Sequence, residues 1–206
     1  MYHKYQTEAL VLGSREVGEA DKVCALYTRD FGLVRARVSG VRKETSKMRY
    51  ALQHYSRANV GLVRGARGWR VAGAVALDTT ARTDTAGIRV FARIGELVSR
   101  LVPGEEENPY LYEALSQAHT VLMSGGSLTS AAPSLATIEI VCVARILYAL
   151  GYLSVEALNT TLALRSLGEV GLFTHTAYGL EHLTEAESMR EDLLLSINRA
   201  LNETHL

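Results

Sequence analysis

The chain has 206 residues, of which 48% are apolar, so it can form one domain or two small ones around a packed core, and wholesale disorder is not expected. Its 22 Lys and Arg balance its 22 Asp and Glu, but residues 1–80 hold 14 of the cations and 7 of the acids, a net charge of +7. Residues 81–206 hold the other 8 cations and 15 acids, a net charge of −7. This split indicates two units with different partners, and the basic unit suits a polyanion such as nucleic acid. Attraction between the halves, or to a neighbouring subunit, is the alternative.

The sequence shows no signal for export or membrane insertion. The N-terminus lacks a long apolar core followed by a small-residue cleavage site. The most apolar stretch, residues 138–153, is interrupted by Glu139 and Arg145, and it is too short to span a bilayer. Cys24 and Cys142 each lie in an apolar run, where a free cysteine behaves as a small hydrophobe. We therefore expect a cytoplasmic protein without a disulfide.

The first eighty residues have the pattern of short strands. Apolar or alternating runs bounded by turn residues predict strands at 8–14, 23–28, 33–40, 55–64 and 69–77. In the third run, Val34, Ala36 and Val38 alternate with Arg35 and Arg37, which predicts a half-buried strand with a basic outer face. Five short strands at nearly regular spacing predict a small barrel.

Helical spacing follows. Apolar residues at Ile88, Phe91 and Val98 predict a helix that begins near residue 86 and ends at Pro103. Further helices are predicted at 110–123, at 135–150 with Ser134 as N-cap, and at 185–202, where residues 184–187 match a capping box. A short helix is expected near 155–164. The fold class is thus α+β, with a barrel domain at 1–80 and an all-α domain at 81–206.

Motifs of nucleotide, metal and nucleophilic chemistry are missing. The chain has no Gly-rich loop ending in Gly-Lys-Ser/Thr, no G-x-G-x-x-G after a strand and no G-x-S-x-G. It also lacks His-x-x-Glu-His and Cys-x-x-Cys, and His175 and His182 have no identifiable third partner. We expect no catalytic residue, no cofactor and no metal site, and hence a protein that is not an enzyme.

Cations and aromatic rings alternate along the predicted barrel, as in proteins that hold single-stranded nucleic acid, where cations follow the phosphates and rings stack on bases. The candidate phosphate-binding residues are Arg35, Arg37, Arg42, Lys43, Lys47 and Arg49, and the candidate stacking residues are Phe31, Tyr50, Tyr55 and Trp69. Each ring can instead belong to the core, and Arg35 and Arg37 can form a merely solvated face. Four cations within residues 42–49 repel one another unless an anion binds, so this cluster favours a functional role.

One long segment resembles a known family. "EALVLGSREVGEADKVCALYTRDFGLVRARVSGVRKETSKMRYALQHYS", residues 8–56, resembles the opening of RecO, the bacterial recombination mediator. The shared features are an apolar strand ending in Val-Leu, a Glu-x-Asp segment, a strand ending in Thr, a turn into Gly-Leu-Val, a Gly-Val-Arg tripeptide and a Ser-basic run ending in Leu-Gln. The similarity is good over about the first 65 residues, and beyond them it rests on length and pattern more than on residues.

The resemblance implies an OB-fold followed by a helical domain, without hydrolase activity. Members of this family bind single- and double-stranded DNA, anneal complementary strands and act with RecR. They help to load RecA onto DNA coated by the single-strand-binding protein SSB, and some bind the acidic-hydrophobic SSB tail through the helical domain. Many also carry a four-cysteine zinc module after a Leu-Gly-Tyr segment. Leu150-Gly151-Tyr152 is present here, but residues 153–170 contain no cysteine, so no zinc module is expected.

Three arginines in the helical half are candidates for binding such an acidic tail: Arg93, Arg100 and Arg145. An apolar groove beside an arginine suits an acidic-hydrophobic peptide. The alternative is local pairing, of Arg93 or Arg100 with Glu96 and of Arg145 with a buried acid. For the whole chain, the rival functions are an adaptor whose basic barrel docks an acidic protein and an RNA-binding OB-fold factor.

Overall fold

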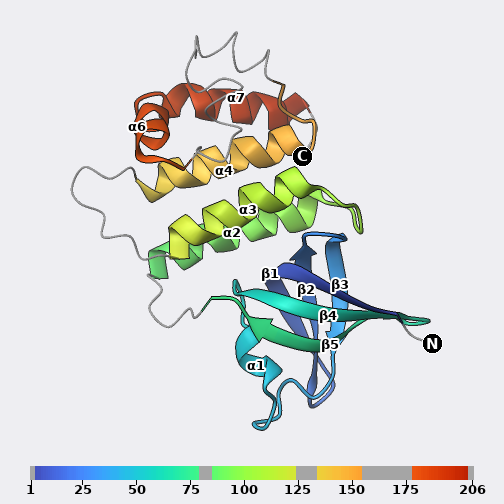
Figure 1. Cartoon of the computed structure of the whole chain (residues 1–206). Helices are drawn as coiled ribbons and strands as arrows, with labels where there is room; N and C mark the ends of the chain where they lie inside the picture. Colours follow the sequence, from blue (N-terminus) through green and yellow to red (C-terminus); the bar gives the residue numbers. More distant parts are fainter. Residues whose placement is uncertain (1–2, 79–84, 124–133, 155–177, 204–206) are drawn as a thin grey trace. The chain divides into compact units, whose positions relative to one another are not determined.

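The computed structural model describes residues 3–78, 85–123, 134–154 and 178–203 (Figure 1). The chain divides into two compact units. Unit 1 comprises Met1–Arg82 and Gly95–Tyr112, and unit 2 comprises Thr83–Ile94 and Glu113–Leu206. The domain boundary predicted at residue 80 lies outside the described residues. Over the described ranges, no helix is both long and apolar enough to cross a membrane.

Five strands in unit 1 close into a barrel in the order β1-β2-β3-β5-β4 (Figure 1). The strands are β1 (Lys4–Val17), β2 (Asp21–Thr28), β3 (Gly32–Val38), β4 (Arg57–Gly65) and β5 (Gly68–Ala76). All neighbours are antiparallel except β3 and β5, which are parallel. This barrel, followed by helices, confirms the predicted α+β class with an N-terminal OB-fold.

The first strand is twice as long as its sequence pattern predicted because it pairs with two neighbours. Residues Lys4 to Leu10 pair with β4, and residues Ala9 to Val17 pair with β2. The register with β2 shifts between Val11 and Gly13, just past Leu10, the last residue that pairs with β4. The alternation in β3 is confirmed, with Val34, Ala36 and Val38 buried and the two arginines between them exposed.

A short helix, α1 (Met48–Ala51), was not predicted and packs against β5. The segment around it contributes three members of the barrel core, Val41, Ala51 and Leu52. These three side chains are buried in the same cluster as strand residues such as Leu26. The connection between β3 and α1 therefore contributes to the barrel core. Four residues are too short a run for helical periodicity to be visible in a sequence.

Unit 1 also contains the end of α2 (Thr85–Leu101), the start of α3 (Pro109–Met123) and the segment that joins them. This part of the chain packs on the barrel. The backbone N–H of Leu33 donates to the carbonyl of Gly104 at 3.2 Å. The hydroxyl of Tyr112 donates to the Glu8 carboxylate at 3.1 Å, and the same carboxylate accepts from Arg29 at 3.2 Å. Burial and the neighbouring Glu8 charge raise the pKa of Tyr112 well above its ordinary value, so this hydroxyl stays a donor. These contacts tie the acidic segment, residues 103–108, and the start of α3 to the barrel.

Unit 2 is helical. The N-terminal part of α2 lies beside α3, because Gly87 allows the backbone of Leu122 to approach and Phe91 packs edge-on against His119 at 5.1 Å. The helix α4 (Leu135–Ala149) is buried along most of its length and packs against α6 (Leu180–Ser188) and α7 (Arg190–Glu203). Its N-cap is Ser134, as predicted, whose hydroxyl oxygen accepts from the N–H of Thr137 at 3.2 Å.

The prediction of one last helix at 185–202 is wrong. The segment forms two helices separated at Met189, and Thr184 lies inside α6 instead of capping it. The buried positions Leu183, Ala186, Leu193 and Ile197 keep helical spacing across the break, so the apolar pattern could not reveal it. The helix expected near 155–164 lies outside the described residues.

Candidate nucleic-acid interface

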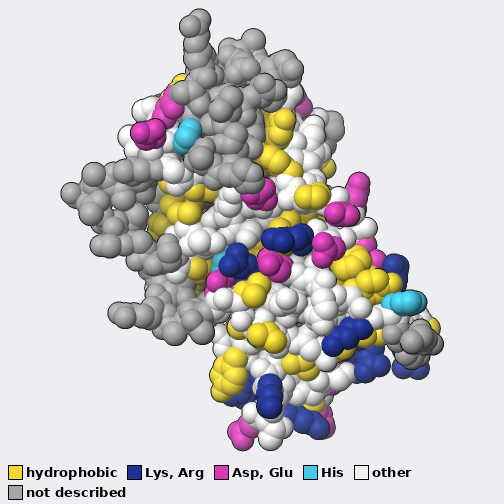
Figure 2. Space-filling view, in the orientation of Figure 1, with side chains coloured by type: hydrophobic (Ala, Val, Ile, Leu, Met, Phe, Trp, Pro, Cys, Tyr) yellow, Lys and Arg dark blue, Asp and Glu magenta, His cyan; other side chains and the backbone are white. Residues whose placement is uncertain are grey.

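The outer surface of β3 presents the first two predicted phosphate ligands. Arg35 and Arg37 are both exposed and point away from the core, because residues two apart in a strand share a face. Within the described ranges Arg35 has no acid at ion-pair distance, whereas Arg37 is held by a carboxylate. Figure 2 shows Lys and Arg side chains gathered over the barrel, with a few acids among them.

Asp21, at the start of β2, is that carboxylate. Its Oδ2 accepts from Nε and Nη2 of Arg37 at 2.9 and 2.7 Å, and its Oδ1 accepts from the backbone N–H of Gly40 at 2.8 Å. The bond from Gly40 and then the bonds from Arg37 lower the pKa of Asp21 below its ordinary value, so it is ionised near neutral pH. One carboxylate therefore joins the outer face of β3 to the backbone that follows it.

The basic loop, defined here as residues 39–47 between β3 and α1, is also fastened at Arg42. The backbone N–H of Arg42 donates to the carbonyl of Ala20 at 3.0 Å, and its Nη1 donates to the carbonyl of Gly18 at 3.3 Å. Its Nη2 lies 3.2 Å from Oε2 of Glu16. Arg42, a predicted phosphate ligand, thus holds the basic loop against the β1–β2 turn.

The remaining predicted cations project from this anchored loop and from α1. Lys43 and Lys47 are exposed, and neither has an acid at ion-pair distance in the described part of the chain. Arg49 is exposed and lies over the ring of Tyr50 at 5.2 Å, donating to its hydroxyl at 3.3 Å. Cationic groups without counter-charges attract a polyanion most strongly, because no internal pair has to be broken first.

Strand pairing adds two arginines that the sequence reasoning missed. Arg15 lies opposite Val23, Val23 lies opposite Arg37, and Arg37 lies opposite Arg70. Directly opposite residues share a face, so Arg15, Arg37 and Arg70 form an arginine row across four strands, and all three are exposed. The pairing register between strands creates this row. A sequence shows which residues alternate within one strand, but not which residues of different strands lie opposite one another.

The predicted stacking residues divide by exposure. Trp69 is only 5% exposed and packs in the core with Phe31 and with Tyr5, at ring distances of 5.4 and 5.6 Å. Tyr55 is half-buried, and its ring is 5.8 Å from that of His54. Tyr50, at 64% exposure, presents the most accessible ring of the predicted set. Tyr5, at 37%, was not predicted.

The three candidate tail-binding arginines are divided between the two units. Arg100 is exposed and belongs to unit 1, whereas Arg93 and Arg145 belong to unit 2. Arg93 forms two bonds to Glu139, at 2.6 and 2.5 Å, which raise its pKa further. Arg145 is only 1% exposed, donates to Gln117 at 2.6 Å and lies over the ring of Tyr178 at 5.3 Å.

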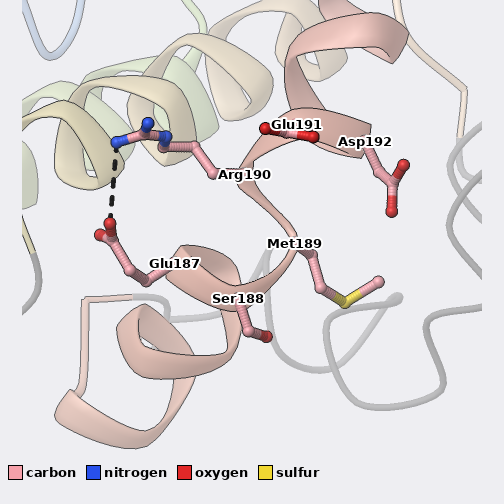
Figure 3. Close-up of a pocket in the computed structure, with 6 residues that line it drawn as sticks. All are labelled: Glu187, Ser188, Met189, Arg190, Glu191 and Asp192. Carbon is pink, nitrogen blue, oxygen red and sulfur yellow. Dashed lines mark ion pairs between the residues drawn. The ribbon is translucent and has the colours of Figure 1, made fainter.

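A polar hollow of about 320 Å³ lies where α6 meets α7 (Figure 3). Its lining residues are Glu187, Ser188, Met189, Arg190, Glu191 and Asp192. Glu187 points toward Arg190, 3.7 Å away, while Glu191 and Asp192 point elsewhere. The described residues contain no group of three His, Cys, Asp or Glu side chains that could hold a metal ion, here or elsewhere. Both cysteines are buried and free, and burial raises their pKa to about 11.

The barrel is similar in sequence to the N-terminal domain of a known protein family. Residues 1–70 match the family model described as recombination protein O, N terminal, which covers β1 to β4 and the first residues of β5. The chain is also similar to proteins named DNA repair protein RecO. One, from Pelotomaculum thermopropionicum, is 34% identical over 134 residues, which cover 59% of this chain and 48% of the relative.

Two further relatives with that name come from Geobacter. The protein of Geobacter metallireducens is 32% identical over 127 residues, covering 61% of this chain and 52% of the relative. That of Geobacter sulfurreducens is 32% identical over 130 residues, covering 62% and 54%. The chain thus spans about half the length of these relatives. Through its N-terminal barrel, the chain is similar to the RecO family.

Proposed function

We propose that this protein binds single- and double-stranded DNA along the arginine row and the basic loop. The observation that carries the proposal is a set of exposed cations on the outer face of the barrel and its basic loop that have no acid at ion-pair distance within the described ranges: Arg15, Arg35, Arg70, Lys43 and Lys47. Contacts of such groups with phosphates dominate affinity for nucleic acid and read no sequence. The exposed ring of Tyr50 beside Arg49 supplies a surface for stacking of an unpaired base.

The role that fits this surface and the family is that of a recombination mediator in DNA repair. In this proposal the protein anneals complementary strands and, with RecR, helps to load RecA onto DNA coated by SSB. It acts by binding alone, without catalysis or cofactor. Exposed arginines of the helical region, such as Arg93 and Arg100, remain proposed contacts for the acidic SSB tail. The names of the relatives and the matched N-terminal family support this role.

Salt-dependent oligonucleotide binding tests the proposal. A fluorescent single-stranded homopolymer is titrated with the full chain and with the triple variant Arg35→Ala, Lys43→Ala, Lys47→Ala at several salt concentrations. Loss of about three phosphate contacts should make the negative slope of log K against log salt shallower by about 2. The control variant, Arg89→Ala, Arg190→Ala, Arg199→Ala, removes the same charge from exposed positions in unit 2.

The two variants separate specific binding from bulk charge. Equal loss in both would show that net charge alone governs binding, and unchanged affinity and slope in a folded barrel variant would refute the proposal. Competition with RNA of the same sequence distinguishes a DNA-binding protein from an RNA-binding factor. Annealing of complementary strands, with and without SSB, then tests the mediator role.

A further inference from the structure

Asp21 stands out because it is an acid within the proposed polyanion-binding surface. Its side chain is 19% exposed, and Arg37 lies opposite Arg70 in the arginine row. Considered only as charge, an ionised carboxylate there repels phosphate and occupies one arginine. The charge-only expectation is therefore that removing it strengthens DNA binding.

The hydrogen bonds of Asp21 indicate the opposite. Both oxygens are used: one accepts from two nitrogens of the Arg37 guanidinium, and the other accepts from the backbone N–H of Gly40. Gly40 is the second residue after β3, at the start of the basic loop, and has a positive φ of 65°. Asp21 thus determines where the loop leaves the barrel.

The loop conformation matters because its two lysines, unlike Arg42, have no side-chain bond or ion pair among the described residues. After Arg42, Lys43 N–H bonds to the carbonyl of Gly40 and Ser46 N–H bonds to that of Lys43, so each turn is built on the one before. The first of these turns begins at Gly40, whose backbone N–H donates to Asp21. Long lysine side chains gain affinity only when the backbone that carries them is already in place, because ordering a loop upon binding costs free energy.

We propose that Asp21 is a positioning residue for the polyanion site, one that holds the basic loop so that Lys43 and Lys47 reach phosphates together with the arginine row. The inference rests on the proposed function. It predicts that neutralising this acid weakens DNA binding, although the change removes a negative charge and releases Arg37.

A charge-matched comparison tests the inference in the full chain. Asp21→Asn and Glu44→Gln each remove one negative charge from the same surface, but Glu44 is exposed in the loop and has no ion pair or side-chain bond among the described residues. Glu44→Gln should tighten binding to a single-stranded homopolymer about twofold, the modest effect of one screened charge. Asp21→Asn should weaken it about fivefold, the factor for losing roughly one hydrogen bond.

Two further variants separate positioning from general damage to the fold. Asp21→Glu keeps the carboxylate and should recover part of the affinity. In a background of Lys43→Ala and Lys47→Ala, the Asp21→Asn penalty should disappear, because the side chains through which it acts are gone. Hydrogen exchange at the Gly40 amide should be faster in Asp21→Asn, and the melting temperature of each variant is measured alongside.

The outcomes are distinct. If the wild-type chain binds no oligonucleotide with steep salt dependence, the proposed function fails. If wild type binds and Asp21→Asn tightens binding as Glu44→Gln does, the proposed function stands and the positioning role is wrong. A penalty that persists unchanged in the double-lysine background also overturns the role, because it shows that Asp21 acts by another route.

Discussion

Gly32 lies directly against the backbone of Glu106. A Cβ placed on Gly32 would come 2.1 Å from the carbonyl oxygen of Glu106, and Gly32 also has a positive φ of 62°. Both residues belong to unit 1, so this approach is part of how the acidic segment at 103–108 packs on the barrel. The neighbouring bond from Leu33 to Gly104 depends on the same approach.

We expect Gly32→Ala to destabilise the protein by about 3 kcal/mol, through left-handed strain and displacement of the acidic segment. Gly18→Ala is the matched control, since Gly18 has a φ of 63° and nothing within 4 Å of its Cβ position. It should cost about 1 kcal/mol. Urea unfolding followed by circular dichroism measures both variants, and equal losses would show that the packing against Glu106 contributes nothing.

The arginine row gives a prediction that strand alternation in the sequence could not have given. The double variant Arg15→Ala, Arg70→Ala should bind oligonucleotide more weakly. Its negative slope of log K against log salt should be shallower by about 1.5. Neither residue forms an ion pair within the described ranges, so the melting temperature should change little. Arg57→Ala with Arg64→Ala is the control, because these two pair with Asp78 and Glu105. A larger binding loss in the control would show that the binding site is not at the arginine row.

Arg145 should matter for stability. Arg145→Ala removes a buried cation together with its bond to Gln117 and its contact with Tyr178, and we expect a loss of about 3 kcal/mol. Arg93→Ala should cost less than about 1 kcal/mol, because the Arg93 side chain is 58% exposed and its pair with Glu139 is screened by solvent. Thermal unfolding measures both. If Arg145→Ala keeps full stability and loses binding to an SSB-tail peptide, the side chain is a peptide receptor after all.

Acid should weaken the start of α4 through Glu187. This carboxylate accepts bonds from the hydroxyls of Thr137 and Ser134, which lower its pKa below 4.5. A lowered carboxyl pKa stabilises the fold above the unfolded value, and the gain is lost as pH falls through the folded value. Glu187→Gln should therefore destabilise the protein at neutral pH, and the difference from wild type should disappear as pH falls through the lowered folded pKa. Glu191→Gln, which removes an exposed acid of the same hollow, is the control variant.

Metal analysis should find no stoichiometric zinc. The chain has two cysteines, both buried and free, and the described residues hold no cluster of metal ligands. A structural zinc site would contribute to folding, so a chelator would lower the melting temperature if one existed. One zinc per chain retained after dialysis would contradict this expectation.

The sequence predicted local features well wherever local periodicity determines them. The buried alternation of Val34, Ala36 and Val38 and the N-cap at Ser134 depend on neighbours along the chain, and both are confirmed. The break at Met189 was missed because the apolar spacing continues through it.

The candidate site was only partly visible for a related reason. A run of cations marked the basic loop, but Arg15 and Arg70 are 55 residues apart in sequence and meet the row only through strand register. The hydrogen bonds of Asp21 were also missed, since nothing in a sequence shows that one carboxylate will accept bonds from both Arg37 and Gly40.

The closure of the barrel rests on a narrow seam. Only two residue pairs, Ala36 with Trp69 and Arg37 with Arg70, join β3 to β5, whereas the other strand pairs share seven or more. Opening this seam costs fewer backbone bonds than opening any other, so native-state hydrogen exchange should be fastest along it. Two of the four seam residues are arginines of the row. A polyanion bound to both would span the seam, so its binding energy would also hold the sheet closed.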